Sequence, residues 1–182
     1  MSNMLIRHAD ADRDCAACAA IYEPFVRGTV VSFEEQAPDG RELAERIQRI
    51  SRTHPWLVSE QDGAVTGYAY ASPHRARAAY RWATDVTIYV APDHHRRGVG
   101  RALYSELLHR LTEQGFHVAC AGVTLPNEAS IGLHRALGFN EIGTYRRIGF
   151  KFGGWHDVTW MQRELRPRGV PPQEPAQPER EG

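Results

Sequence analysis

The sequence predicts an α+β domain, a mixed sheet with helices on both of its faces. Apolar runs over residues 56–60 and 64–72 flank a Gln-Asp-Gly turn, which is typical of a β-hairpin and so of antiparallel pairing. A stripe of apolar side chains at helical spacing, closed by a glycine, is formed by Val99, Leu103, Leu107 and Leu111. Because strand and helix patterns interleave along the chain, helices are expected on both sides of the sheet.

The N-terminal third is expected to hold one strand and two helices. Residues 5–6 indicate a short strand, and Asp10 and Asp12 offer N-caps to a helix that runs to about residue 27. Pro-Asp at 38–39 predicts the start of a second helix, and the apolar stripe of this helix ends near residue 54. The segment between the helices, 28–35, is rich in β-branched and aromatic residues, which favours an extended conformation.

The hairpin strands follow, and the later elements alternate again. They are expected as a strand over 82–90, a helix over 99–114, a strand over 116–124, a short helix over 127–137, and two β segments within 141–152 and 155–164. From residue 166 onward the chain carries five prolines and one aliphatic residue larger than alanine, too little apolar surface to offset the entropy of ordering. We therefore expect a domain over 1–165 and a disordered proline-rich tail over 166–182.

Composition narrows the function classes. The 182 residues include 22 Lys and Arg against 22 Asp and Glu, so the formal charge is zero. This balance lacks the basic excess typical of nucleic-acid binding, and no apolar run approaches the ~20 residues of a membrane-spanning helix. Without a secretory pattern at residue 1, a cytoplasmic location is expected. Small-molecule chemistry is favoured over nucleic-acid or membrane partners.

The three cysteines, Cys15, Cys18 and Cys120, do not form a disulfide framework. Cys15 and Cys18 are spaced Cys-x-x-Cys, but no further pair of ligands at zinc spacing accompanies them. We expect both to be small core residues of the first helix. His94 and His95 likewise lack convergent partners in the sequence, so no metal site is expected.

The turn before the helix at residue 99 is the main chemical signal. It follows a strand and contains Gly98 and Gly100 among arginines, and a helix N-terminus of this kind binds anions through its backbone N–H groups. Arg96, Arg97 and Arg101 add charge suited to a pyrophosphate. No Gly-Lys-Ser/Thr follows, which excludes a Walker A loop. The alternative is an ordinary helix start with solvated arginines.

Residues 95–100, His-Arg-Arg-Gly-Val-Gly, resemble the acetyl-CoA signature Arg/Gln-x-x-Gly-x-Gly/Ala of the GNAT superfamily of N-acetyltransferases, with histidine at the first position. Further matches over about residues 4–165 are similar to the phosphinothricin N-acetyltransferase group: PWLV at 55–58, GYAYA at 67–71, AYRW at 79–82, LPN at 125–127, LHRALGF at 133–139 and GFKFGGWHDV at 149–158. The resemblance implies a GNAT-like, mostly antiparallel sheet whose fourth and fifth strands splay apart around the pantetheine arm of acetyl-CoA.

The same resemblance implies which residues bind the cofactor. The backbone of the fourth strand would hold the pantetheine, the arginine-glycine turn would hold the pyrophosphate, and the start of the helix after the fifth strand would contact the arm. These positions are Ile88, Tyr89, Val90, Arg96, Arg97, Gly98, Val99, Gly100, Arg101, Asn127 and Ser130. Asn127 and Ser130 have the alternative role of a plain helix cap.

The group's catalytic glutamate aligns with Asp85, which would take a proton from the acceptor ammonium directly or through water. His134 aligns with a catalytic histidine and can act as base or acid, because imidazole titrates near neutral pH. The alternatives are a strand-end carboxylate paired with an arginine and a buried structural histidine.

The acceptor pocket is expected from Arg75 and Arg77, which match basic positions of the group, with Phe33 and Tyr80 as walls. A solvated loop is the alternative for the two arginines. The resemblance thus implies a homodimeric, metal-free enzyme that acetylates a small glutamate-like amino acid: phosphinothricin, the herbicide it would inactivate, or methionine sulfoximine or sulfone. Asp85 in place of glutamate leaves open another small amine, and a CoA-binding module without turnover is the rival from another class.

Overall fold

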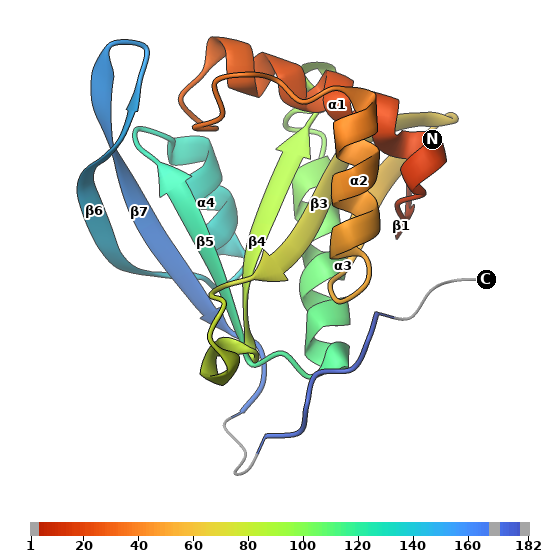
Figure 1. The fold of residues 1–182 in the computed structure, drawn as a ribbon, viewed down its shortest axis with the longest axis vertical. Coiled ribbons are helices and arrows are strands. Elements are labelled where there is room, and N and C mark those ends of the chain that lie inside the picture. The colour runs from red at the N-terminus through yellow and green to blue at the C-terminus, as the bar shows by residue number, and fades with distance from the viewer. Residues whose placement is uncertain (1–3, 168–171, 179–182) are drawn as a thin grey trace.

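The computed structural model describes residues 4–167 and 172–178 (Figure 1). Within them, seven strands form a single sheet in the order β1-β2-β3-β4-β5-β7-β6. The strands are β1 (Leu5–His8), β2 (Trp56–Gln61), β3 (Ala64–Pro73), β4 (Ala83–Val90), β5 (Val118–Thr124), β6 (Asn140–Lys151) and β7 (Gly154–Glu164). Every neighbouring pair is antiparallel except β4 and β5, which confirms the predicted mixed sheet.

Four helices flank this sheet: α1 (Ala11–Gly28), α2 (Gly40–Ile50), α3 (Val99–Gln114) and α4 (Glu128–Ala136). Figure 1 shows α1 and α2 on one face and α3 and α4 on the other, as the sequence predicts. Asp10 caps α1 by accepting from the amides of Asp12 and Arg13. None of these helices has both the length and the apolar character needed to cross a bilayer.

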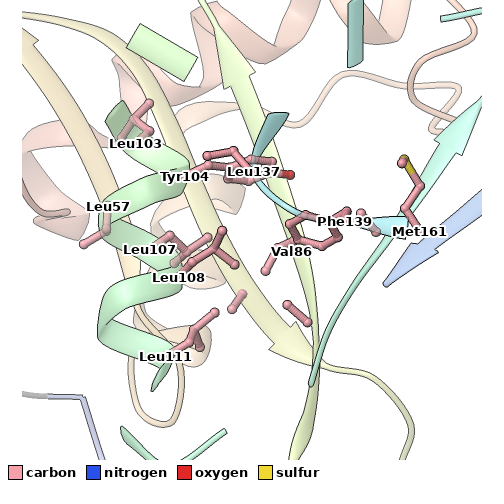
Figure 2. Close-up of a cluster of buried hydrophobic side chains, with 14 of the residues drawn as sticks. Leu57, Val86, Leu103, Tyr104, Leu107, Leu108, Leu111, Leu137, Phe139 and Met161 are labelled. Atoms are coloured by element: carbon pink, nitrogen blue, oxygen red, sulfur yellow. The ribbon is translucent and has the colours of Figure 1, made fainter. Parts of the chain in front are cut away.

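Strand alternation divides the core into two clusters. On β2, Leu57 faces α3 and α4, while its neighbours Trp56 and Val58 face α1 and α2. The α3 stripe packs into the first cluster, shown in Figure 2 with Val86, Phe139 and Met161 around it. Cys18 is fully buried in the second cluster and Cys15 is half-buried beside it, so Cys18 is the core residue expected and Cys15 lies at the core's margin.

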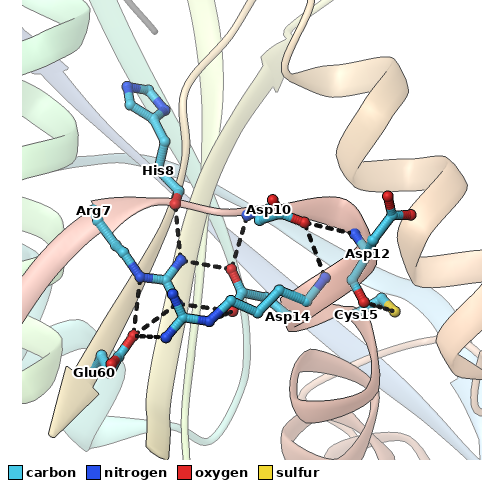
Figure 3. A network of polar contacts seen from close by, with 8 residues as sticks. Arg7, His8, Asp10, Asp12, Asp14, Cys15 and Glu60 are labelled. Carbon is cyan, nitrogen blue, oxygen red and sulfur yellow. Dashed lines mark hydrogen bonds and ion pairs between the residues drawn. The ribbon is translucent and has the colours of Figure 1, made fainter. Parts of the chain in front are cut away.

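A polar network fixes the start of α1 against the sheet (Figure 3). The Arg7 guanidinium donates to both carboxylate oxygens of Asp14 at 2.7 and 2.8 Å and to Glu60 Oε2 at 2.8 and 3.0 Å. Burial alone would raise the pKa of Asp14, but the hydrogen bonds from Arg7 and from the Asp10 amide outweigh it and lower that pKa. A bidentate pair of this kind joins β1, β2 and α1.

The segment 28–35, for which an extended conformation was expected, forms no strand within the described chain. It is a loop held by a buried lysine from the far hairpin. Lys151 Nζ donates to the carbonyl oxygens of Val26, Thr29 and Ser32 at 2.6, 2.9 and 2.7 Å. These carbonyls lie at and beyond the end of α1, where a cation interacts favourably with the helix dipole.

β4 and β5 separate soon after they begin. They pair only at Ala83–Val118, Thr84–Ala119 and Asp85–Cys120, after which β4 continues along β3 and β5 continues along β7. The splayed strands expected from the resemblance are therefore present. Asp85 lies at the point where the cleft between them opens.

Part of the predicted tail contacts the domain. Residues 168–171 and 179–182 lie outside the described residues, whereas 172–178 run past the end of α3 (Figure 1). There the Ala176 amide donates to the Gln114 carbonyl at 2.7 Å, and the Arg81 guanidinium pairs with Glu174. The domain boundary near residue 165 stays a prediction, but the described stretch is anchored rather than free.

Candidate active site

A cavity of about 110 Å³ occupies the cleft between β4 and β5. Its lining includes Ile88 and Tyr89 of β4 and Asn127, Ser130 and His134 from the start and middle of α4. The structure thus brings together two segments, 88–89 and 127–134, that lie almost forty residues apart in the sequence. All five are cofactor or catalytic candidates of the sequence analysis.

The backbone of β4 presents only alternate residues to this cleft. The Ala91 amide donates to Thr66 of β3, and the register continues through the Tyr89–Tyr68 pair. In an antiparallel ladder, alternate residues bond to the same neighbour, so Tyr89 bonds toward β3 while Ile88 and Val90 turn their backbone groups toward the cleft. Tyr89 therefore turns its backbone groups to β3, and its ring packs on the α1 side against Tyr22 and Phe25.

The arginine-glycine turn lies at the open end of the cleft. Arg96 and Gly98 have φ values of 60° and 83°, and Gly98 is the N-cap of α3 without a side-chain capping bond. The first amides of α3 consequently have no intrahelical acceptor, as at any helix start, and are available to an anion. Arg96, Arg97 and Arg101 are exposed around them, whereas the Val99 side chain is buried in the core and leaves only its backbone available.

His95, where the GNAT signature has arginine or glutamine, has a structural role in this chain. Its Nε2 donates to the Val90 carbonyl oxygen at 2.9 Å. Because Val90 ends β4 on the cleft side, this hydrogen bond ties the turn to the strand. The departure at the first signature position therefore leaves the turn itself intact.

Asn127, the N-cap of α4, and His134 within the helix both hydrogen-bond the backbone of Ser130. Asn127 Oδ1 accepts from the Ser130 amide at 3.1 Å, which is the cap that the sequence analysis holds as the alternative. His134 Nδ1 lies 2.7 Å from the Ser130 carbonyl oxygen, which can only accept, so Nδ1 carries the proton. Burial lowers the pKa of His134, and its Nε2 has no hydrogen-bond partner among the described residues. The ring thus offers a buried, unprotonated nitrogen.

Asp85 and His134 lie on opposite faces of the sheet. Val86 packs in the cluster with α3, so its neighbour Asp85 points to the α1 and α2 side. His134 contacts the Tyr104 and Phe139 rings of the α3 cluster, at centroid distances of 5.2 and 5.1 Å. The two predicted catalytic side chains therefore approach the cleft from different sides.

Asp85 has a partner that the sequence analysis did not single out. Its Oδ1 lies 2.6 Å from His74 Nδ1. Burial raises the pKa of Asp85, against the opposing effects of His74 and the Arg75 charge. The signal that could have found His74 is the hairpin register, because β3 pairs Ser72 with Asp85 and His74 follows two residues later.

His74, Asp85 and Cys120 form a group of the described residues whose donor atoms lie within 4.8 Å of one another, as metal ligands can. However, two ligands of a tetrahedral zinc ion, each bonded at about 2.0 Å, are roughly 3.3 Å apart, longer than the 2.6 Å of the His74–Asp85 contact. Burial also raises the pKa of the Cys120 thiol to about 11. The geometry fits a shared proton better than a metal ion.

The predicted acceptor residues do not share one cavity. Arg75, Arg77 and Tyr80 line a second hollow of about 460 Å³, which Pro175 and Ala176 also border. The Tyr80 ring contacts the His74 ring edge-on at a centroid distance of 5.9 Å, and His74 in turn hydrogen-bonds Asp85. Phe33 lies against the β6–β7 hairpin, where Gly149 leaves no room for a Cβ: one built there would fall 2.2 Å from the Phe33 ring.

Sequence comparisons with known proteins find acetyltransferases. The model of the Acetyltransferase (GNAT) family matches residues 17–139. A phosphinothricin N-acetyltransferase of Streptomyces viridochromogenes is 41% identical over 92% of this chain and 93% of its own. An L-methionine sulfoximine/L-methionine sulfone acetyltransferase of Salmonella typhimurium is 38% identical, over 92% and 98% respectively.

Solved structures of acetyltransferases share this fold. A phosphinothricin acetyltransferase from Sinorhizobium meliloti in complex with AcCoA has a TM-score of 0.85 and 40% identity, covering 89% of this chain and 88% of its own. A putative acetyltransferase from Salmonella typhimurium with its cofactor acetyl-CoA has a TM-score of 0.88 and 37% identity, with coverages of 93% and 98%. The chain belongs to the GNAT family of acetyltransferases.

Proposed function

We propose that this acetyltransferase moves the acetyl group of acetyl-CoA to the primary amine of a small glutamate-like amino acid, such as phosphinothricin or the sulfoximine or sulfone of methionine. One observation carries the proposal: the cleft between β4 and β5 runs from the helix start at Gly98, which has no side-chain cap, to a partly buried carboxylate at Asp85. The relatives named as phosphinothricin and methionine sulfoximine/sulfone acetyltransferases support the choice of acceptor.

The residues at hand fit acetyl-CoA. The pyrophosphate would lie at the amides of the α3 start, with Arg96, Arg97 and Arg101 around it. The backbone groups of Ile88 and the amide of Val90 would hydrogen-bond the arm, since the Val90 carbonyl is held by His95, and Asn127 and Ser130 line the same cavity. When bound, acetyl-CoA supplies the activated acyl group; the chain supplies orientation and proton transfer.

Asp85 supplies the carboxylate for proton removal, either directly or through a group that it holds. An amine attacks a thioester only as the free base, so a proton must leave the ammonium first. Asp85 lies at the vertex of the cleft on the face of α1 and α2, from which the acceptor would enter. His134, with its unprotonated Nε2, lies on the other face beside the cofactor arm, where it would orient the thioester or accept a proton.

Arg75 and Arg77 give the preference for an anionic acceptor. Replacing either by alanine should raise the KM for phosphinothricin about 10-fold or more, because a charge-assisted hydrogen bond to a carboxylate or phosphinate oxygen contributes ~1.5–3 kcal/mol. Initial rates with phosphinothricin and with an uncharged primary amine measure this. Arg41→Ala, an exposed α2 position, is the control. Equal loss with both acceptors would mean that the loop was merely destabilised.

A second candidate acceptor class is another small amine, and the observation that favours it is Asp85 itself. The side chain is one methylene shorter than the glutamate implied by the resemblance, so the distance to the acceptor nitrogen changes. A CoA-binding module without turnover is the remaining alternative. Thiol release from acetyl-CoA over a panel of acceptor amines distinguishes all three.

We also infer a homodimer that acts in the cytoplasm. The β6–β7 hairpin exposes six large apolar side chains: Ile142, Tyr145, Ile148, Phe150, Phe152 and Trp155. Monomeric proteins seldom leave this many large apolar side chains of one hairpin exposed to water. A second copy, presenting the same patch about a two-fold axis, would cover it.

Light scattering on the eluting protein tests the dimer. The wild type should have about twice the 20.5 kDa mass of one chain, and Phe152→Asp with Trp155→Asp should shift it to the single-chain mass. Leu5→Asp, at an exposed apolar position of β1, should leave the dimer intact. A wild type that elutes at the single-chain mass would refute the inference.

A further inference from the structure

The partner of Asp85 lies outside the machinery that the family resemblance implies. His74 follows the end of β3, and its Nδ1 lies 2.6 Å from Asp85 Oδ1, which is short for a nitrogen–oxygen hydrogen bond and typical of a charge-assisted one. The two side chains are 18% and 28% exposed. The pair is therefore half-enclosed and reachable from solvent on the acceptor face.

The hydrogen bond determines which ring nitrogen can react. With Asp85 ionised, Nδ1–H donates to the carboxylate, so in the neutral ring Nε2 carries the lone pair. Nε2 lies on the opposite edge of the ring from Nδ1 and thus away from Asp85. A carboxylate that orients an imidazole and stabilises its protonated form is a recurrent arrangement of general bases.

Aromatic contacts hold the ring in this orientation. The Tyr80 and Trp160 rings meet the His74 ring edge-on, at centroid distances of 5.9 and 5.8 Å. Tyr80 belongs to the same loop as Arg75, whose charge acts on Asp85. The ring is consequently fixed between the carboxylate and the loop assigned to the acceptor.

We propose that His74, oriented by Asp85, is the general base that takes the proton from the acceptor ammonium. The proposal rests on the proposed function and names a further catalytic residue for it. The proposal also explains why aspartate can replace the glutamate implied by the resemblance. Aspartate is one methylene shorter, and an imidazole between Asp85 and the acceptor spans more than that difference.

The proton balance is complete. The ammonium gives one proton to His74 Nε2, and the free amine attacks the thioester carbonyl to form a C–N bond. The tetrahedral intermediate then breaks its C–S bond, and the sulfur leaves with its electron pair. Of the two protons that the nitrogen loses in all, one ends on the CoA thiol and the other passes from the His74 imidazolium to solvent.

Two variants of one residue test the role. His74→Asn keeps an amide N–H that can donate to Asp85 but offers no basic nitrogen, so it should lower kcat about 10²-fold while the KM for acetyl-CoA stays nearly unchanged. His74→Ala leaves a gap, and added imidazole should restore much of its rate. His109→Asn, on the exposed side of α3, is the matched control and should keep the wild-type rate.

The outcomes are distinguishable. A His74→Asn enzyme close to the wild-type rate would overturn the proposal, as would a slow His74→Ala enzyme that imidazole does not rescue, because a purely structural role predicts no rescue. A wild-type chain that releases no thiol with any amine would instead contradict the proposed function itself.

Discussion

Replacing Asp85 by asparagine is expected to lower turnover by about 10²-fold or more while leaving acetyl-CoA binding nearly intact. The amide is the same size as the carboxylate but neutral, so it cannot support proton transfer to His74 as the Asp85 carboxylate does. Asp85 lies at the vertex of the cleft, apart from the amides assigned to the pyrophosphate, and this separation predicts the split between kcat and cofactor affinity. Single-turnover rates and cofactor titration measure the two.

Asp12→Asn, an exposed position in the first turn of α1, is the control for loss of a carboxylate elsewhere. The wild-type rate should also fall on acidification, because Asp85 must be ionised to act, and it should do so at a higher pH than for an exposed aspartate, since burial raises the pKa of Asp85. An Asp85→Asn enzyme as fast as the wild type would remove Asp85 from the mechanism.

Replacing Gly98 by valine is expected to weaken acetyl-CoA binding at least ~10-fold, because a left-handed backbone costs a β-branched residue about 1–3 kcal/mol. Gly98 has a φ of 83° and no atoms within 4 Å of a Cβ built on it, so the damage is conformational rather than a clash with the protein. The added side chain would also project beside the first amides of α3. The KM for acetyl-CoA, measured at saturating acceptor, reports the loss.

A glycine with the same left-handed backbone conformation, but outside the proposed cofactor site, provides the control. Gly63, in the β2–β3 turn, has a φ of 79° and equally open surroundings. Gly63→Val should lower the thermal midpoint about as much as Gly98→Val does, yet leave the KM for acetyl-CoA unchanged. Equal KM effects in both variants would mean that Gly98 acts through stability alone.

Much of the fold could be predicted because its signals are local. The α3 stripe and the Asp-Gly hairpin are read from periodicity and turn chemistry within a few residues, and both are present. The cofactor turn at Gly98 is also local, since a strand, two glycines and a helix start are contiguous. The separation of β4 from β5 is not local, and it was expected only through the family resemblance.

What the sequence did not predict depends on contacts between distant residues. The loop over 28–35 is held by Lys151, more than a hundred residues away, a contact that its own composition does not indicate. The contact between His74 and Asp85 depends on the β3–β4 register, and the direction of the Tyr89 backbone depends on which neighbour it pairs with. The stretch 172–178 has a disordered composition but is anchored by Gln114 and Arg81.

The central claim is acceptor-dependent acetyl transfer at the cleft between β4 and β5. The most direct test is release of CoA thiol from acetyl-CoA by the full chain over a panel of phosphinothricin, methionine sulfoximine, methionine sulfone, a polyamine and a short peptide. We predict release with the first three and little with the last two. Release with the polyamine or peptide alone would contradict the assigned acceptor, and no acceptor-dependent release with any of them would contradict the claim of catalysis.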